Sequence, residues 1–267
     1  MGYTALFLLL PTGIVVVGAF LGTNGVTLSN FGALNQPYLI TAFTSSLGLS
    51  AVSAIVGAVF GALFAYAVAT GNPQGALRRI VSSASGVLAQ FGGVTLAFAF
   101  IATIGGNGFI TLWLKSHGVD PYANGVWLYE LPGLVLVYAY FQIPLMVLVF
   151  LPALDGIRPQ WREATESLGG STWHYWRYVA GPLLMPAFLG ATLLLFANAF
   201  SAYATAAALI SQGNPILPIA VANLLNSETG LQQPGLAQSL ALEMIVIVAV
   251  VMFLYAVLQQ RTARWLR

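Results

Sequence analysis

Residues 47–69 read LGLSAVSAIVGAVFGALFAYAVA, and this stretch decides the fold class. It contains no charged side chain, and a helix that crosses a bilayer needs about 20 mostly apolar residues. Lipid supplies no hydrogen-bond partners, so the backbone groups of such a stretch must bond to one another. The sequence therefore predicts a membrane-spanning α-helix over residues 47–69.

Five more stretches have the same character, at residues 3–21, 80–104, 131–151, 183–209 and 236–258. Over the 267 residues, 58% are hydrophobic and only 6% are charged. A soluble domain carries about 25% charged residues, so this chain lacks the polar surface that water requires. We predict an all-α polytopic membrane protein with about six transmembrane helices, in which residues 1–267 form a single domain.

Small residues within the first quoted stretch indicate where it packs. Gly57, Gly61 and Ala65 recur at a spacing of four residues, which places them on one face of a helix. Small side chains on one face let two helix backbones approach closely in a membrane. We expect this face to contact another helix of the same chain.

The basic residues predict the orientation in the membrane. With six spans, one side holds eight of the nine Lys and Arg residues: Arg78, Arg79, Arg158, Arg162, Arg177, Arg261, Arg264 and Arg267. Only Lys115 falls on the other side. Because cytoplasmic loops are enriched in Lys and Arg, both termini are predicted to be cytoplasmic in a bacterial inner membrane.

The segments on the outer side are of two kinds. Residues 22–36 and 212–235 are rich in Gly, Asn, Gln, Ser and Pro. Residues 105–130 form a longer segment, in which 109–115 are apolar enough to lie along the membrane surface or to re-enter the bilayer. Both alternatives are open from the sequence.

The longest cytoplasmic loop, residues 152–182, carries the strongest functional signal, and residues 155–182 read DGIRPQWREATESLGGSTWHYWRYVAGP. Pro159 suits the first position of a helix. The less polar face of that helix is formed at helical spacing by Trp161, Ala164, Thr165 and Leu168. The loop is thus predicted to carry a short amphipathic helix.

Gly169 and Gly170 are predicted to end this helix, because glycine accepts the left-handed cap conformation. Ser171 or Thr172 can then cap a second helix, rich in aromatic residues. An amphipathic helix held by such a break can dock in a groove of a partner protein or lie flat on lipid headgroups. Local physics alone does not choose between these two roles.

The loop resembles the EAA loop of permeases from binding-protein-dependent ABC importers, whose pattern is Glu-Ala-Ala, three residues, Gly, nine residues, Ile-x-Leu-Pro. This chain has Glu163-Ala164-Thr165, then Gly169 at the same spacing, and Val179-Ala180-Gly181-Pro182 at the end. Thr165 replaces the second alanine, and Gly181 replaces the leucine. The resemblance extends more loosely over residues 40–258.

The resemblance implies a type I ABC importer permease fold, with the helix at 163–168 as the coupling helix. It implies that the residues contacting a cytoplasmic ATPase are Trp161, Glu163, Ala164, Thr165, Leu168 and Gly169. It further implies an ABC ATPase dimer, a second identical or homologous permease subunit, and an extracytoplasmic solute-binding protein. Substrate would cross by alternating access driven by the ATPase.

The absence of nucleotide-binding, metal-binding and catalytic motifs from the sequence agrees with a permease that is driven by a separate ATPase. Lys115 is the only lysine, so no Gly-Lys-Ser/Thr phosphate-binding loop exists and any ATP and Mg²⁺ belong to partner subunits. The chain has no cysteine, and His117 and His174 fall on opposite sides of the membrane, so we assign no metal. We see no catalytic constellation and expect a non-enzymatic membrane subunit without a nucleic-acid partner.

Polar residues inside the spans are candidates for the translocation path, namely Tyr138, Gln142, Asn198, Ser201 and Tyr203. Interhelical hydrogen bonding is an equally good explanation for them. Glu243 is an ionisable group within the sixth span, which leaves an ATPase-independent secondary transporter as the alternative function. Residues 196–209 resemble permeases of the polyamine, phosphonate, iron and thiamine group, from which we expect a polyamine substrate.

Overall fold

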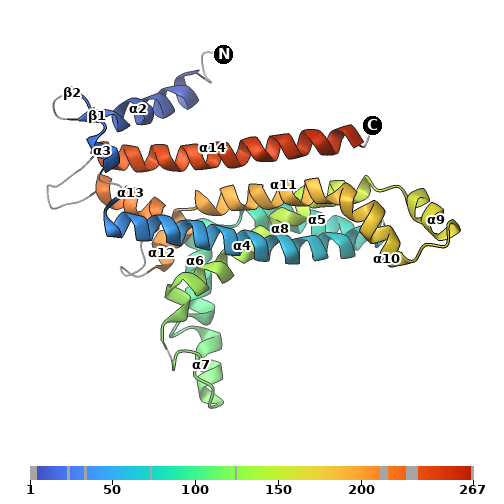
Figure 1. The fold of residues 1–267 in the computed structure, drawn as a ribbon. Helices are drawn as coiled ribbons and strands as arrows, with labels where there is room; N and C mark the ends of the chain where they lie inside the picture. The colour runs from blue at the N-terminus through green and yellow to red at the C-terminus, as the bar shows by residue number, and fades with distance from the viewer. Residues whose placement is uncertain are drawn as a thin grey trace.

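The computed structural model describes residues 5–22, 25–32, 35–72, 74–123, 125–210, 216–226 and 234–265. Tyr3, Arg267 and parts of the outer segments predicted at 22–36 and 212–235 lie outside these residues. Four long helices run roughly along one direction (Figure 1). They are α4 (Pro37–Ala69), α8 (Leu131–Asp155), α11 (Gly181–Phe200) and α14 (Pro234–Trp265).

The central helix is α8, which packs against α4, α11 and α5 (Ala76–Gln90). Helix α14 covers α11, and α2 (Leu10–Ala19) packs on α14 in turn. A π-helical turn (Ala5–Leu9) precedes α2. The short strands β1 (Leu21–Gly22) and β2 (Gly25–Val26) pair antiparallel after it, followed by α3 (Ser29–Gly32).

The predicted fold class is confirmed, since helices make up nearly all of the described chain. Among the described residues, five helical stretches are long and apolar enough to cross a membrane: Pro37–Ala69, Gly93–Ser116, Leu131–Asp155, Thr172–Phe200 and Pro234–Leu258. The sixth predicted span, at residues 3–21, corresponds to the shorter apolar helix α2 and the turn before it.

The third span differs from its prediction. Instead of one helix over residues 80–104, the structure has α5 and then α6 (Gly93–Ile104), with a break at Phe91 and Gly92. Gly93 takes a positive φ of 72°, a conformation that glycine adopts without the penalty of a Cβ. Helix α7 (Phe109–Ser116) follows α6, so the apolar segment predicted at 109–115 is a helix.

The fifth span is also divided. A single helix was expected over residues 183–209, but α11 ends at Phe200 and α12 (Ala204–Leu209) starts after a gap. Apolar composition predicted both stretches correctly as helical. It did not reveal the interruptions, because the residues at each break are as small or apolar as their neighbours.

The predicted small-residue face of α4 is confirmed as a close helix contact. A Cβ on Gly57 would lie 2.7 Å from the Cβ of Gln142 on α8. A Cβ on Gly61 would lie 2.4 Å from the Cβ of Met146. Both separations are far below normal contact, so these glycines set how closely α4 approaches α8.

The remaining elements are a 3₁₀ turn (Trp127–Tyr129) before α8, and α13 (Leu217–Leu225) between α12 and α14. The loop after α8 contains α9 (Pro159–Ser167), α10 (Thr172–Tyr175) and a π-helical turn (Trp176–Ala180) that leads into α11. The first residue of α13 is held by the Ser46 hydroxyl of α4, which accepts a hydrogen bond from the Leu217 N–H at 2.7 Å.

Candidate functional site

Helix α9 projects from one end of the helix bundle. Figure 1 shows α9 and α10 beyond the ends of α4, α5 and α8, at the opposite end from α3 and the two strands. Helix α9 begins at Pro159, as predicted, and ends at Ser167. The amphipathic loop helix is therefore a distinct arm outside the apolar bundle.

Two glycines terminate this arm as the sequence predicted. Gly169 has φ of 77°, and its N–H donates to the Glu166 carbonyl at 3.0 Å. The Gly170 N–H donates to the Thr165 carbonyl at 2.9 Å. This pair of bonds is the Schellman motif, which satisfies the last carbonyls of a helix and reverses the chain.

Gly170 has a different role from Gly169, which the pattern of two consecutive glycines does not reveal. A Cβ on Gly170 would lie 2.7 Å from the Thr165 methyl group and 2.9 Å from the Thr165 carbonyl oxygen. A Cβ on Gly169 would meet no atom of the described residues within 4 Å. Glycine is required at position 169 because the backbone there has a positive φ. It is required at position 170 because any larger side chain would collide with Thr165.

The chain re-enters helix immediately after this turn. Ser171 caps α10, as one of the two predicted alternatives, and its hydroxyl lies 2.8 Å from His174 Nδ1. The Ser171 N–H donates to the same nitrogen at 3.3 Å. This capping box fixes the direction in which the chain returns toward α11.

The predicted docking residues differ in exposure. Leu168 is 88% exposed, and Glu163 and Ala164 are exposed beside it. Trp161 and Thr165 are half-buried, and the Thr165 hydroxyl donates to the Trp161 carbonyl at 2.8 Å. An exposed leucine at the end of a protruding arm is an apolar group without cover from its own subunit.

The two helix breaks meet inside the bundle. The Gly93 N–H at the beginning of α6 donates to the Thr205 hydroxyl of α12 at 2.8 Å. The Tyr138 hydroxyl of α8 donates to the Ala202 carbonyl, in the gap between α11 and α12, at 3.0 Å. Side chains thus replace helical hydrogen bonds at both breaks, and we call this region the junction.

The junction lies part-way along the membrane-spanning helices. Leu49 of α4 belongs to the same buried cluster as Ala206 of α12 and Leu96 of α6. Leu49 lies about 18 Å from the beginning of α4 at Pro37, at 1.5 Å for each residue of the helix. Interrupted helices at such depth expose backbone groups where lipid supplies no partners, so they occur where protein or an aqueous cavity surrounds them.

The residues predicted for a path fall into two groups. Tyr138 and Gln142 are fully buried within the subunit, and Gln142 Nε2 donates to the Ser53 hydroxyl of α4 at 3.2 Å. Both side chains therefore serve contacts between helices in this structure. Asn198, Ser201 and Tyr203 are exposed beside the junction.

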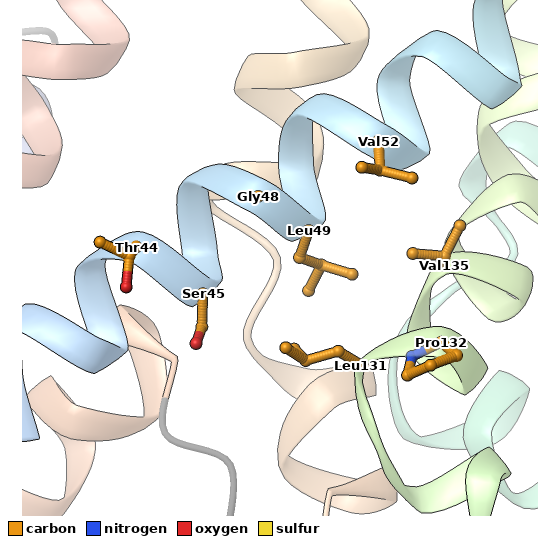
Figure 2. A pocket seen from close by; sticks show the side chains of 8 residues that line it. All are labelled: Thr44, Ser45, Gly48, Leu49, Val52, Leu131, Pro132 and Val135. Carbon is orange, nitrogen blue, oxygen red and sulfur yellow. The ribbon is translucent and has the colours of Figure 1, made fainter.

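A cavity of about 630 Å³ lies between α4 and the beginning of α8 (Figure 2). Its lining consists of Thr44, Ser45, Gly48, Leu49, Val52, Leu131, Pro132 and Val135. Figure 2 shows the two hydroxyl-bearing side chains at one end and the valines at the other. The residues that line this cavity carry no charge, and they belong to the first half of α4 and the beginning of α8.

Glu243 of α14 lines a separate cavity of about 190 Å³ with Asn35, Leu39, Ile40, Phe43 and Leu240. Among the described residues that line this cavity, Glu243 is the one ionisable side chain. Among the described residues, no group of three or more His, Cys, Asp or Glu side chains is placed to hold a metal ion. The junction and the Glu243 cavity are formed by different residues.

The family profile described as "Binding-protein-dependent transport system inner membrane component" matches residues 109–264, more than half of the chain. The chain belongs to this family. The match includes α9, the junction residues of α11 and α12, and most of α14. The chain is thus a multi-pass inner-membrane permease component of an ABC transporter.

Curated relatives are similar over most of the chain. The sulfate transport system permease protein CysT of Escherichia coli is 25% identical over 86% of this chain and 80% of its own length. The trehalose permease SugB of Mycobacterium tuberculosis is 25% identical over 94% of this chain and 84% of its length. Other relatives are named for ferric iron and thiamine, and this chain spans 30% and 20% of their lengths. None of these is named for a polyamine, so the expected polyamine substrate is not supported.

A solved structure confirms the fold. The crystal structure of a bacterial ABC transporter involved in importing the acidic polysaccharide alginate contains a chain with a TM-score of 0.75 to this one. The two are 15% identical, and the alignment covers 98% of this chain and 91% of the other. The predicted type I permease fold is therefore confirmed.

Proposed function

We propose that this permease docks a cytoplasmic ATPase through α9 and lines a translocation path beside the junction. The main support for this proposal is the exposure of Leu168, which is 88% exposed at the end of an arm that is terminated by Gly169 and Gly170. Such an exposed leucine favours cover by a partner, and it belongs to the predicted docking set of Trp161, Glu163, Ala164, Thr165, Leu168 and Gly169. ATP and Mg²⁺ bind the partner and not this chain.

The transport step is mechanical. Two ATPase subunits that close on ATP displace the α9 arms of two permease subunits, and the path changes from outward to inward access. A solute-binding protein delivers substrate on the outer side. In another importer, the alginate system, a crystal structure holds a pentasaccharide-bound periplasmic protein in complex with the transporter. The second permease subunit is identical or homologous.

The path is proposed along Asn198, Ser201 and Tyr203. Their amide and hydroxyl groups are exposed from the subunit at a depth where lipid cannot hydrogen-bond them. This favours a face covered by water or by the second subunit. The three side chains carry no charge, so they offer hydrogen bonds but no counter-charge to a polycation.

The orientation is proposed with α9 and both termini in the cytoplasm. Arg78, Arg158, Arg162 and Arg177 all belong to the segments at the α9 end of the bundle. Lys115, in the last turn of α7, lies 3.5 Å from Asp120 in the segment between α7 and the 3₁₀ turn. The alternative of a secondary transporter through Glu243 is not favoured, because the chain belongs to an ABC permease family.

The test is purification of the tagged chain from its native membrane in mild detergent, with mass spectrometry of the proteins that accompany it. Wild type should recover an ABC ATPase, and Gly169→Asp should lose most of it. Gly118→Asp is the matched control, since Gly118 has φ of 83° and, like Gly169, no atom within 4 Å of an added Cβ. Equal ATPase recovery with Gly169→Asp, or none with wild type, would refute the proposal.

A further inference from the structure

We propose that the corner formed by the end of α4 and the beginning of α5 receives the displacement of α9 and transmits it to the junction. This corner holds both ends of the loop that carries α9, through Tyr66 of α4 and Arg78 of α5. The inference rests on the proposed docking role of α9. It assigns positioning residues that lie outside the EAA-like pattern.

The first anchor is an ion pair between Arg78 and Asp155. Asp155 is the last residue of α8, immediately before the loop leaves the bundle. The Arg78 side chain is 20% exposed and that of Asp155 is 40% exposed, so water screens this pair less than a fully exposed one. One turn later on α5, Val81 packs on the buried cluster that contains Leu154.

The second anchor is an aromatic contact between Tyr66 and Trp176. Their ring centroids lie 5.3 Å apart with the rings at 74°, which is the favourable edge-to-face arrangement. Trp176 begins the π-helical turn through which the loop returns to α11. It also packs on the buried cluster that contains Leu184.

Between these anchors, the chain leaves the bundle through α9 and returns through α10 (Figure 1). The main packing partner of α9 is α10. A displacement of α9 therefore reaches the bundle at the two ends of the loop, at Asp155 and Trp176, and Ile157 also packs on the buried cluster beside Asp155. Asp155 and Trp176 contact the same corner, so the loop cannot move independently of α4 and α5 while the two contacts hold.

Helix α5 connects the corner to the junction. It is 15 residues long, about 22 Å at the usual helical rise, and it packs along α8. Beyond its end, the Gly93 N–H is bonded to the Thr205 hydroxyl of α12. Only Phe91 and Gly92 separate the end of α5 from Gly93, so a shift of α5 along its axis is passed through this short link to the bond between Gly93 and Thr205. A movement of Arg78 would therefore shift the part of the junction that lies next to the exposed residues Ser201 and Tyr203.

The chain contains no cysteine, so one introduced thiol can be labelled selectively on this subunit. Ser201→Cys places a single thiol at the exposed edge of the junction. The complex with its ATPase is treated with a water-soluble maleimide, with and without Mg-ATP and orthovanadate. The rate of labelling then reports movement at the junction without knowledge of the solute.

We expect Mg-ATP with vanadate to change the labelling rate, and Arg78→Gln or Asp155→Asn to reduce this change by about fivefold, the lower end of ordinary coupling between sites. The exchange Arg78→Asp with Asp155→Arg should restore it. Arg79→Gln is the control, because among the described residues the Arg79 side chain donates to the Gln74 carbonyl, at 3.2 Å, and forms no ion pair. Tyr66→Leu tests the second anchor independently.

The outcomes separate the two proposals. If wild type recovers no ATPase, the proposed function fails and this inference fails with it. If ATPase is recovered but Ser201→Cys shows no nucleotide response, or Arg78→Gln and Tyr66→Leu respond as wild type does, only the corner's role is refuted. Loss of response without restoration by the charge exchange would also refute the first anchor, provided that ATPase recovery is unchanged.

Discussion

Replacing Gly61 by alanine should destabilise the bundle, whereas the same replacement at Gly48 should stabilise it. Both glycines lie within α4, so alanine improves the intrinsic helix propensity by about 1 kcal/mol at each. No atom in the described part of the chain lies within 4 Å of an added Cβ at Gly48. The difference between the two variants therefore isolates the packing of α4 on α8.

The magnitude follows from the distances at Gly61. Its added Cβ would lie 2.4 Å from the Met146 Cβ and 2.8 Å from the Ile143 carbonyl oxygen, where ordinary contacts are 3.4–4 Å. Neither atom is at the free end of a flexible side chain, so α4 and α8 must separate. Overpacking of this kind costs about 1–3 kcal/mol. Because the gain in helix propensity is the same at both positions, Gly61→Ala should be less stable than Gly48→Ala by about 1–3 kcal/mol.

The assay is thermal unfolding in detergent, followed by the loss of the monodisperse peak in size-exclusion chromatography. Gly48→Ala should retain or raise the midpoint of wild type, and Gly61→Ala should lower it by several degrees. Equal midpoints for the two variants would show that α4 and α8 do not approach as closely as the structure has them.

Three further predictions concern the junction and the arm. Tyr138→Phe removes the hydrogen bond to the Ala202 carbonyl and should cost about 1–2 kcal/mol of stability, seen as a lower midpoint in the same assay; an unchanged midpoint would contradict the bond. Thr205→Val keeps the shape but leaves the Gly93 N–H without its acceptor, so it should destabilise to a similar extent, while Thr205→Ser should not. Leu168→Asp should leave the midpoint unchanged because the side chain is 88% exposed, yet abolish ATPase recovery; a destabilised protein with normal recovery would be the opposite of this expectation.

The end of α9 was predictable from sequence because it is a local event. Pro159 starts the helix and Gly169 ends it through bonds to residues within the same short segment. The small-residue face of α4 was predictable for a similar reason, since a spacing of four residues fixes which side chains share a helix face. Its partner helix, α8, could not be named in advance.

Composition determined that the chain is helical and lies in a membrane, and the spacing in the loop determined the arm and its resemblance to a known family. Only the tertiary structure decided that two of the spans are interrupted and that their breaks meet. Gly93 bonds to Thr205, 112 residues away, and Tyr138 bonds to Ala202, 64 residues away. A helix in lipid can break only where distant side chains satisfy the freed backbone groups, and no local pattern of apolar residues specifies those partners.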